Sequence, residues 1–130
     1  VTTAALMSEN KHLANPCSTD STPTSANQED HVSMSAHGAR RLMKMNRNLC
    51  GILAVEILCG AQGIEFRAPL ETSKTLEKII AMIRKQIPAL TDDRYMAGDI
   101  GKAARMIRSG ELVACIRKNI LPGFNQEKPV

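Results

Sequence analysis

Apolar residues recur every three or four positions along most of the chain, which is the spacing of amphipathic helices. The clearest run is Leu76, Ile79, Ile80, Ile83 and Ile87, and Pro88 ends it. Residues 2–13 predict a short helix capped by Thr2 or Thr3, and Asp99 is the expected cap of a later one. A last short helix is expected between Gly110 and the Leu121-Pro122-Gly123 stop. No alternating strand pattern competes, so the sequence predicts an all-α fold.

The longest helical pattern extends from about Asn27 to Gln62, with a candidate break at His37-Gly38. Its segment ILAVEILCGAQG, residues 52–63, is apolar nearly all round, with Glu56 as the exception. A helix of this kind is buried on every side, and a chain of 130 residues has few helices to surround it. We therefore expect partners around this helix, and an ion pair between Glu56 and an arginine of a neighbouring helix.

Composition narrows the class of protein. The single Tyr, two Phe and absent Trp leave an aliphatic core, which gives a small domain a thin stability margin. The net charge of +4 comes from dispersed basic residues. Without a basic stripe or stacking aromatics, nucleic-acid binding is not expected. No apolar run reaches membrane-spanning length, so no membrane partner is expected either.

The four cysteines are spaced neither as CxxC pairs nor as metal ligands with the three histidines. No signal peptide is visible, so reduced thiols in the cytoplasm are expected rather than disulfides. The chain begins with Val1, inside what reads as an element already under way. We expect it to be part of a longer protein.

The candidate chemistry lies in SANQEDHVSM, residues 25–34, where Gln28, Glu29, Asp30 and His31 are adjacent. A carboxylate beside an imidazole can act as an acid–base pair. If a helix begins near Asn27, however, the acids lie in its first turn, where the helix dipole favours them. Adjacent helical residues also point about 100° apart, so they cannot all face one substrate. The residues alone leave both interpretations open, and no metal site is expected.

The same ten residues resemble a signature of the histidine ammonia-lyases, a branch of the aromatic amino-acid lyase family. Four more segments resemble the family in the same order: VTTAALMSENK, ARRL, ILAVEILCGAQGIEFRAPLETS and DRYMAGDI. The resemblance covers nearly the whole chain and fades after about Gly110. Phenylalanine and tyrosine enzymes usually place Gln where Glu29 stands here, and the histidine enzymes place Glu. Ser35-Ala36-His37-Gly38 departs from the family pattern.

The resemblance implies that residues 1–130 are a single C-terminal helical segment of a homotetrameric lyase with long bundled helices. Residues 14–35 would form an active-site loop, and residues 36–62 a long central helix. The implied reaction eliminates ammonia from L-histidine to give trans-urocanate. Glu29 is the implied catalytic and substrate-binding residue, ahead of Asp30 and His31, and Gln28 is a second substrate-binding candidate.

The family's electrophile is a methylidene-imidazolone (MIO) group made from Ala-Ser-Gly. Residues 1–130 contain no Ala-Ser-Gly, so the N-terminal part of the same enzyme is an implied partner, and the segment alone is expected to be inactive.

Two alternatives remain. The chain could be a non-catalytic helical oligomerisation module, or a relative of the phenylalanine or tyrosine ammonia-lyases or aminomutases. Glu29 disfavours the second, because a carboxylate buried against a phenyl ring is costly. An imidazole or amino group, in contrast, donates a charge-assisted hydrogen bond to it.

The cysteine pattern gives a first test. Thiol titration of the denatured, unreduced polypeptide should find four free thiols, because no pair is expected to be oxidised. A count of two or none would show that disulfides form.

Overall fold

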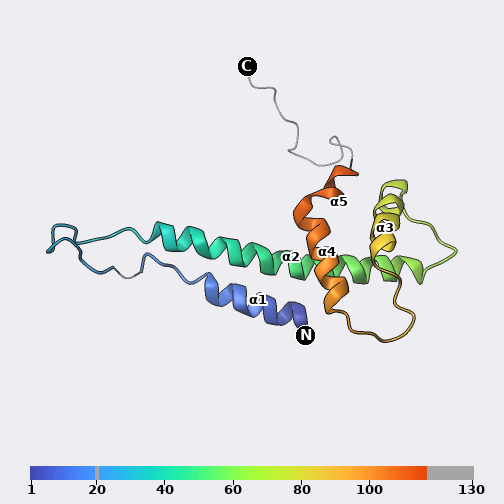
Figure 1. Ribbon diagram of the computed structural model, residues 1–130, viewed down its shortest axis with the longest axis horizontal. Helices are drawn as coiled ribbons and strands as arrows, with labels where there is room; N and C mark the ends of the chain where they lie inside the picture. Colours follow the sequence, from blue (N-terminus) through green and yellow to red (C-terminus); the bar gives the residue numbers. More distant parts are fainter. Residues whose placement is uncertain (20, 117–130) are drawn as a thin grey trace, which may run out of the picture. The chain divides into compact units, whose positions relative to one another are not determined.

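The computed structural model describes residues 1–19 and 21–116, and this part of the chain is helical (Figure 1). Its helices are α1 (Thr2–Leu13), α2 (Ser35–Glu65), α3 (Lys74–Gln86), α4 (Ala97–Ser109) and α5 (Glu111–Ala114). Across these residues the one extended pairing is an isolated bridge between Thr24 and Glu29. The all-α prediction is confirmed. The expected stop at 121–123 lies outside the described residues.

The chain forms two compact units, Val1–Ile52 and Leu53–Val130, and α2 contributes to both. In the first unit α1 lies beside the N-terminal part of α2, and a polar cluster joins them. The side-chain amide of Asn48, which is only 9% exposed, donates to the Glu9 carboxylate at 2.6 Å and to the Asn10 side-chain oxygen at 2.9 Å. Asn10 in turn donates to the Met45 carbonyl at 3.2 Å, and Lys44 pairs with Glu9 at 2.6 Å. The contacts of Lys44 and Asn48 hold the pKa of Glu9 below its usual value.

The second unit has an apolar core where α3, α4 and α5 pack on the C-terminal part of α2. Its buried residues are aliphatic, as the composition predicted: Ala54, Leu58, Ile83, Ile87, Ala103, Met106 and Leu112. Gly110, with a φ of 78°, makes the left-handed turn between α4 and α5. Glycine takes this conformation without steric cost.

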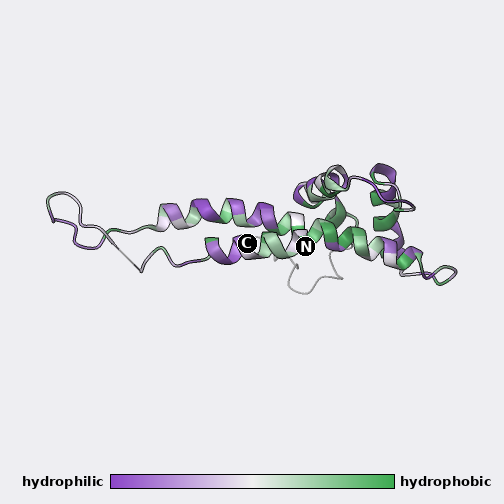
Figure 2. Ribbon diagram, turned by 90° about the horizontal axis from the view of Figure 1, so that it is seen from below, coloured by the Kyte–Doolittle hydropathy of each residue, from purple (hydrophilic) through white to green (hydrophobic). Residues whose placement is uncertain are grey.

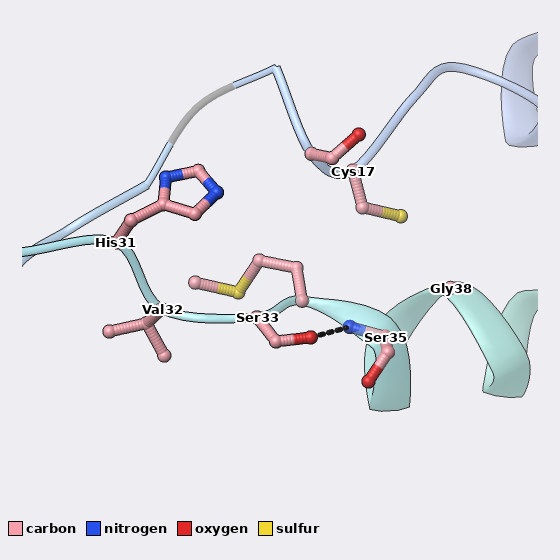
Figure 3. Close-up of a pocket in the computed structure, with 8 residues that line it drawn as sticks. Cys17, His31, Val32, Ser33, Ser35 and Gly38 are labelled. Carbon is pink, nitrogen blue, oxygen red and sulfur yellow. Dashed lines mark hydrogen bonds between the residues drawn. The ribbon is translucent and has the colours of Figure 1, made fainter. Parts of the chain in front are cut away.

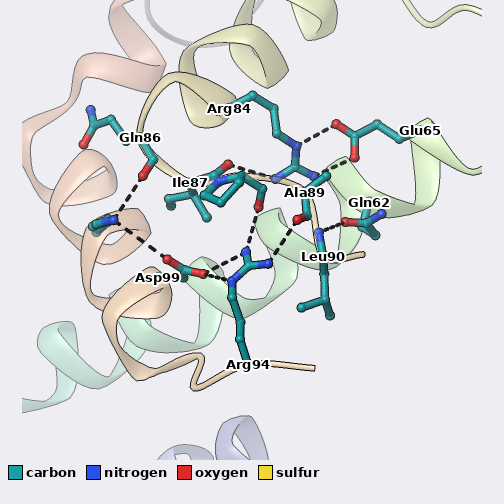
Figure 4. Close-up of polar contacts among 11 residues, drawn as sticks. Gln62, Glu65, Arg84, Gln86, Ile87, Ala89, Leu90, Arg94 and Asp99 are labelled. Carbon is teal, nitrogen blue, oxygen red and sulfur yellow. Dashed lines mark hydrogen bonds and ion pairs between the residues drawn. The ribbon is translucent and has the colours of Figure 1, made fainter. Parts of the chain in front are cut away.

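Two arginines connect the elements of this unit (Figure 4). Arg84 on α3 forms a two-pronged ion pair with Glu65 at the end of α2, at 2.6 and 2.8 Å. This contact holds the pKa of Glu65 below its usual value. Arg94 precedes α4 and bonds the Asp99 carboxylate at 3.0 and 2.9 Å. It also donates to the carbonyls of Ala89 at 3.0 Å and Pro88 at 2.8 Å, which fixes the α3–α4 connection against α4.

Several boundaries differ from the predictions. The expected helix start near Asn27 is wrong, because α2 begins at Ser35. The N-cap residue of α1 is Val1, rather than Thr2 or Thr3 as expected, and its side chain makes no capping hydrogen bond. Asp99 does not cap α4 but lies buried in its first turn, where the N–H groups and Arg94 stabilise its charge.

The long helix is less enclosed than its sequence suggested. Figure 2 shows α2 changing from mainly hydrophilic at its N-terminal end to mainly hydrophobic further along. In the segment 52–63 only Ala54, Leu58 and Ala61 are buried within the chain. Glu56 is exposed and forms no ion pair with any residue that the structure describes, contrary to the expected pairing.

By length and average composition alone, α2 is long and apolar enough to cross a membrane, although the sequence predicted no run of that length. The core helix of a soluble protein passes the same test, so length and composition alone do not decide between the two.

The Arg94 contacts give a stability prediction for the full-length protein. Arg94→Met leaves the Asp99 carboxylate, only 7% exposed, without its main partner, and Lys102 is 3.9 Å away. Breaking a buried ion pair costs about 3 kcal/mol, which urea unfolding should reveal. Arg108→Met is the matched control, because Arg108 is an exposed arginine at the end of the same helix. Equal stability of the two variants would contradict the assignment.

Candidate functional site

The candidate site lies in the loop that joins α1 to α2, residues 14–34. Its tip is a tight antiparallel turn. The Thr24 amide donates to the Glu29 carbonyl at 3.0 Å, and the Glu29 amide donates to the Thr24 carbonyl at 3.3 Å. The Gln28 amide closes the turn on the Ser25 carbonyl at 3.2 Å. The tip is therefore an ordered hairpin-like turn rather than the start of a helix.

Three consecutive residues of the turn have a left-handed backbone. The φ angles are 53° at Ser25, 55° at Ala26 and 66° at Asn27. Asparagine accepts this conformation comparatively well, whereas alanine rarely adopts it. The reversal in chain direction is achieved without a glycine, and it places Gln28 and Glu29 directly after the turn.

The Glu29 carboxylate is exposed and held from one side. The Thr24 hydroxyl donates to Glu29 Oε2 at 3.3 Å. No cation among residues 1–19 and 21–116 pairs with this carboxylate, so it is open to a positively charged or hydrogen-bond-donating ligand. Gln28 is also exposed, next to it at the tip.

A second contact closes the loop below the tip. The Ser21 hydroxyl accepts a hydrogen bond from the Val32 amide at 2.7 Å and donates to the Val32 carbonyl at 3.3 Å. Both residues are half-buried. Residues 22–31, which include the turn, thus form a tip that the contact between Ser21 and Val32 closes at its base.

A cavity of about 380 Å³ lies between the base of the loop and the first turns of α2 (Figure 3). His31 and Cys17 line it from the two sides of the loop, and Gly38 lines it from the helix. A Cβ atom at Gly38 would lie 3.5 Å from the Cys17 sulfur, so chain and helix approach closely there. His31 therefore lies toward the base of the loop, whereas Glu29 lies at the tip.

Residues 27–34 are not helical, so the expectation that Glu29, Asp30 and His31 point about 100° apart on a helix is wrong. Glu29, Asp30 and His31 are all exposed. The structure distinguishes Glu29 in a different way, since it alone of the three pairs with Thr24 through both backbone and side chain. Thr24 and Ser21 were not singled out within the predicted active-site loop, because nothing in its Ser/Thr-rich composition marks which hydroxyls make contacts across it.

In the described part of the chain, no three metal-ligating side chains gather at one point. The four cysteines are not paired with one another in the structure.

Comparisons with known proteins found similar sequences and structures. The model of the aromatic amino acid lyase family matches residues 1–85. A histidine ammonia-lyase from Roseobacter denitrificans is 64% identical over 124 residues, covering 95% of this chain and 24% of that protein. The crystal structure of histidine ammonia-lyase from Trypanosoma cruzi superposes with a TM-score of 0.88 at 38% identity, covering 99% of this chain and 27% of that one. A tyrosine aminomutase from Streptomyces globisporus follows with a TM-score of 0.79 at 34% identity, over 87% and 22% of the two chains.

The fold is similar to that of the solved histidine ammonia-lyase, and the chain belongs to the aromatic amino acid lyase family. It spans about a quarter of the length of these relatives. The alignment of 124 residues extends past Gly110, whereas the match to the family model ends at residue 85.

Proposed function

We propose that this chain is part of a histidine ammonia-lyase that eliminates ammonia from L-histidine to give trans-urocanate. The observation that carries the proposal is the Glu29 carboxylate at the loop tip, in a chain 64% identical to a histidine ammonia-lyase. A carboxylate is the appropriate acceptor for an imidazole N–H or an ammonium group. It is a poor partner for the side chain of phenylalanine.

In this proposal Glu29 binds the imidazole or amino group of the substrate, and Gln28 adds a neutral contact beside it. The Thr24 hydroxyl occupies Oε2 on one side of the carboxylate, which orients it and leaves Oε1 for the substrate. If Glu29 also takes a proton, the same free oxygen is the acceptor.

The MIO group comes from an Ala-Ser-Gly in another part of the enzyme, and it supplies the electrophile that makes ammonia a better leaving group. The residues of this chain fit the substrate rather than that group, since a carboxylate offers it no stabilising donor. On the same proposal no metal takes part.

The proposed enzyme is a homotetramer in the cytoplasm, without nucleic-acid or membrane partners. Along α2, Leu42, Leu49 and Leu53 are 55%, 47% and 36% exposed, and their spacing places them on one helical stripe. An apolar stripe of this kind is typical of a helix whose partners lie outside the chain. The four free thiols fit a reducing compartment.

The decisive variant is Glu29→Gln in the full-length enzyme, which keeps the shape of the side chain and removes its charge. Loss of a charged hydrogen bond should lower kcat/KM for L-histidine roughly 10- to 150-fold. Loss of a general base should lower it on the order of 100- to 10,000-fold. Urocanate formation gives the rate, and the size of the loss distinguishes binding from proton transfer.

Glu71→Gln is the matched control, because Glu71 is an exposed carboxylate in the loop before α3. A folded Glu29→Gln enzyme with the kcat/KM of the wild type would remove Glu29 from the active site. The similarity to a tyrosine aminomutase indicates which alternative substrates to compare with L-histidine. Faster turnover of L-tyrosine or L-phenylalanine than of L-histidine would favour that alternative.

Residues 1–130 expressed alone should form no urocanate and should self-associate. The Ala-Ser-Gly precursor is missing from this segment, and the leucine stripe of α2 is exposed. Light scattering gives the size, and Leu49→Glu should reduce the association. Leu70→Glu is the control, because Leu70 is exposed but lies in a loop away from the stripe. A soluble monomer with measurable turnover would refute this prediction.

A further inference from the structure

Two contacts between its opposite sides hold the Glu29 loop closed, and both pair residues in the same antiparallel register. Thr24 pairs with Glu29 at the tip. Three residues back from Thr24 is Ser21, and three residues on from Glu29 is Val32, which is the second pair. The two sides of the tip therefore run as an antiparallel pair from residue 21 to residue 32, although no ladder of backbone bonds joins them along that length.

The second contact is made by a side chain, and no backbone hydrogen bond joins the described residues Ser21 and Val32. The Ser21 hydroxyl takes over both roles at once, because it accepts from the Val32 amide at 2.7 Å and donates to the Val32 carbonyl at 3.3 Å. One hydroxyl therefore fixes the width of the tip at its base.

We propose that Ser21 is a positioning residue for Glu29: its hydroxyl locks residues 22–31 into one register and thereby sets where the Glu29 carboxylate meets the substrate. The proposal rests on the proposed function, because Ser21 does not contact substrate in it and acts only through Glu29. Without the hydroxyl, Val32 loses both hydrogen bonds and the tip is joined only at Thr24 and Glu29, within the turn itself. The tip then moves as a hinged unit, and Glu29 moves with it.

Positioning explains why a small displacement matters. A misplacement of about 1 Å in an active site can cost on the order of 100-fold in rate. Ser21 lies in the loop and outside the buried core of either unit, so its effect on global stability should be small. The expected signature is a large change in activity with little change in Tm.

The test compares three variants of the full-length enzyme with L-histidine as substrate. Ser21→Ala should lower kcat/KM roughly 10- to 100-fold. Ser21→Thr keeps the hydroxyl and should restore most of that loss. Thr19→Val is the matched control, because among the residues that the structure describes the Thr19 hydroxyl bonds only the nearby Pro16 carbonyl, at 3.2 Å, and makes no contact across the loop. Its kcat/KM should stay within about twofold of the wild type, as for a surface change.

A double-mutant cycle with Glu29→Gln separates positioning from a merely structural role. If Ser21 acts through Glu29, Ser21→Ala should cost much less in the Glu29→Gln background than in the wild type, because the group to be positioned is already disabled. Equal losses in both backgrounds would overturn the proposal. So would wild-type kcat/KM for Ser21→Ala, or a fall in its Tm that accounts for the lost activity.

The cycle also distinguishes this proposal from the proposed function beneath it. A Glu29→Gln enzyme that loses activity beside a fully active Ser21→Ala enzyme rejects only the role of Ser21. A fully active Glu29→Gln enzyme rejects the role of Glu29, and the positioning proposal is rejected with it.

Discussion

The buried amide of Asn48 is the constraint on which the unit with the candidate site depends. Helices that meet through aliphatic side chains alone can slide past one another by a turn at little cost, whereas a buried polar residue has partners in only one register. Asn48 has two such partners on α1, the Glu9 carboxylate and the Asn10 amide. Leu6 presses against Gly51 one turn further along, where a Cβ atom would lie only 3.0 Å from it. A slip of one turn would move α1 by about 5.4 Å and break all of these contacts.

That register matters because α1 and α2 hold the two ends of the loop that carries Glu29. The loop leaves α1 after Leu13 and enters α2 at Ser35, so the distance between its ends is set by how the helices pair. From there the contacts follow the loop outward. Cys17 lies against Gly38 at the base, Ser21 bonds Val32 at the neck, and Thr24 bonds Glu29 at the tip. Each contact is weak when taken alone. Together they fix the position of the exposed Glu29 carboxylate relative to the helix pair.

The parts of this structure that were predictable from sequence are those that repeat. The 3.6-residue period located α3, because Leu76, Ile79, Ile80, Ile83 and Ile87 all lie on the same face of that helix. Single-residue signals failed where a tertiary contact competed: Asp99 is a good cap by type, yet Arg94 bonds it inside the first turn of α4. Asn27 resembled a helix start because the acids after it suit a first turn, but three left-handed residues end that possibility. The hydroxyls of Ser21 and Thr24 had no signal at all, since a contact across a loop leaves no period in the sequence.

The backbone at the tip supplies an argument for function that is independent of any likeness to other proteins. A left-handed conformation costs a residue such as alanine roughly 1–2 kcal/mol, and Ser25, Ala26 and Asn27 adopt it in succession. A spacer of this length could reverse direction with glycine at little cost, so folding alone does not demand this turn. Strain of this kind persists where the surrounding contacts over-determine it, and such places cluster at functional sites. Here the contacts that maintain it are those of Thr24 with Glu29, and the residue they display is the carboxylate to which the proposed chemistry is assigned.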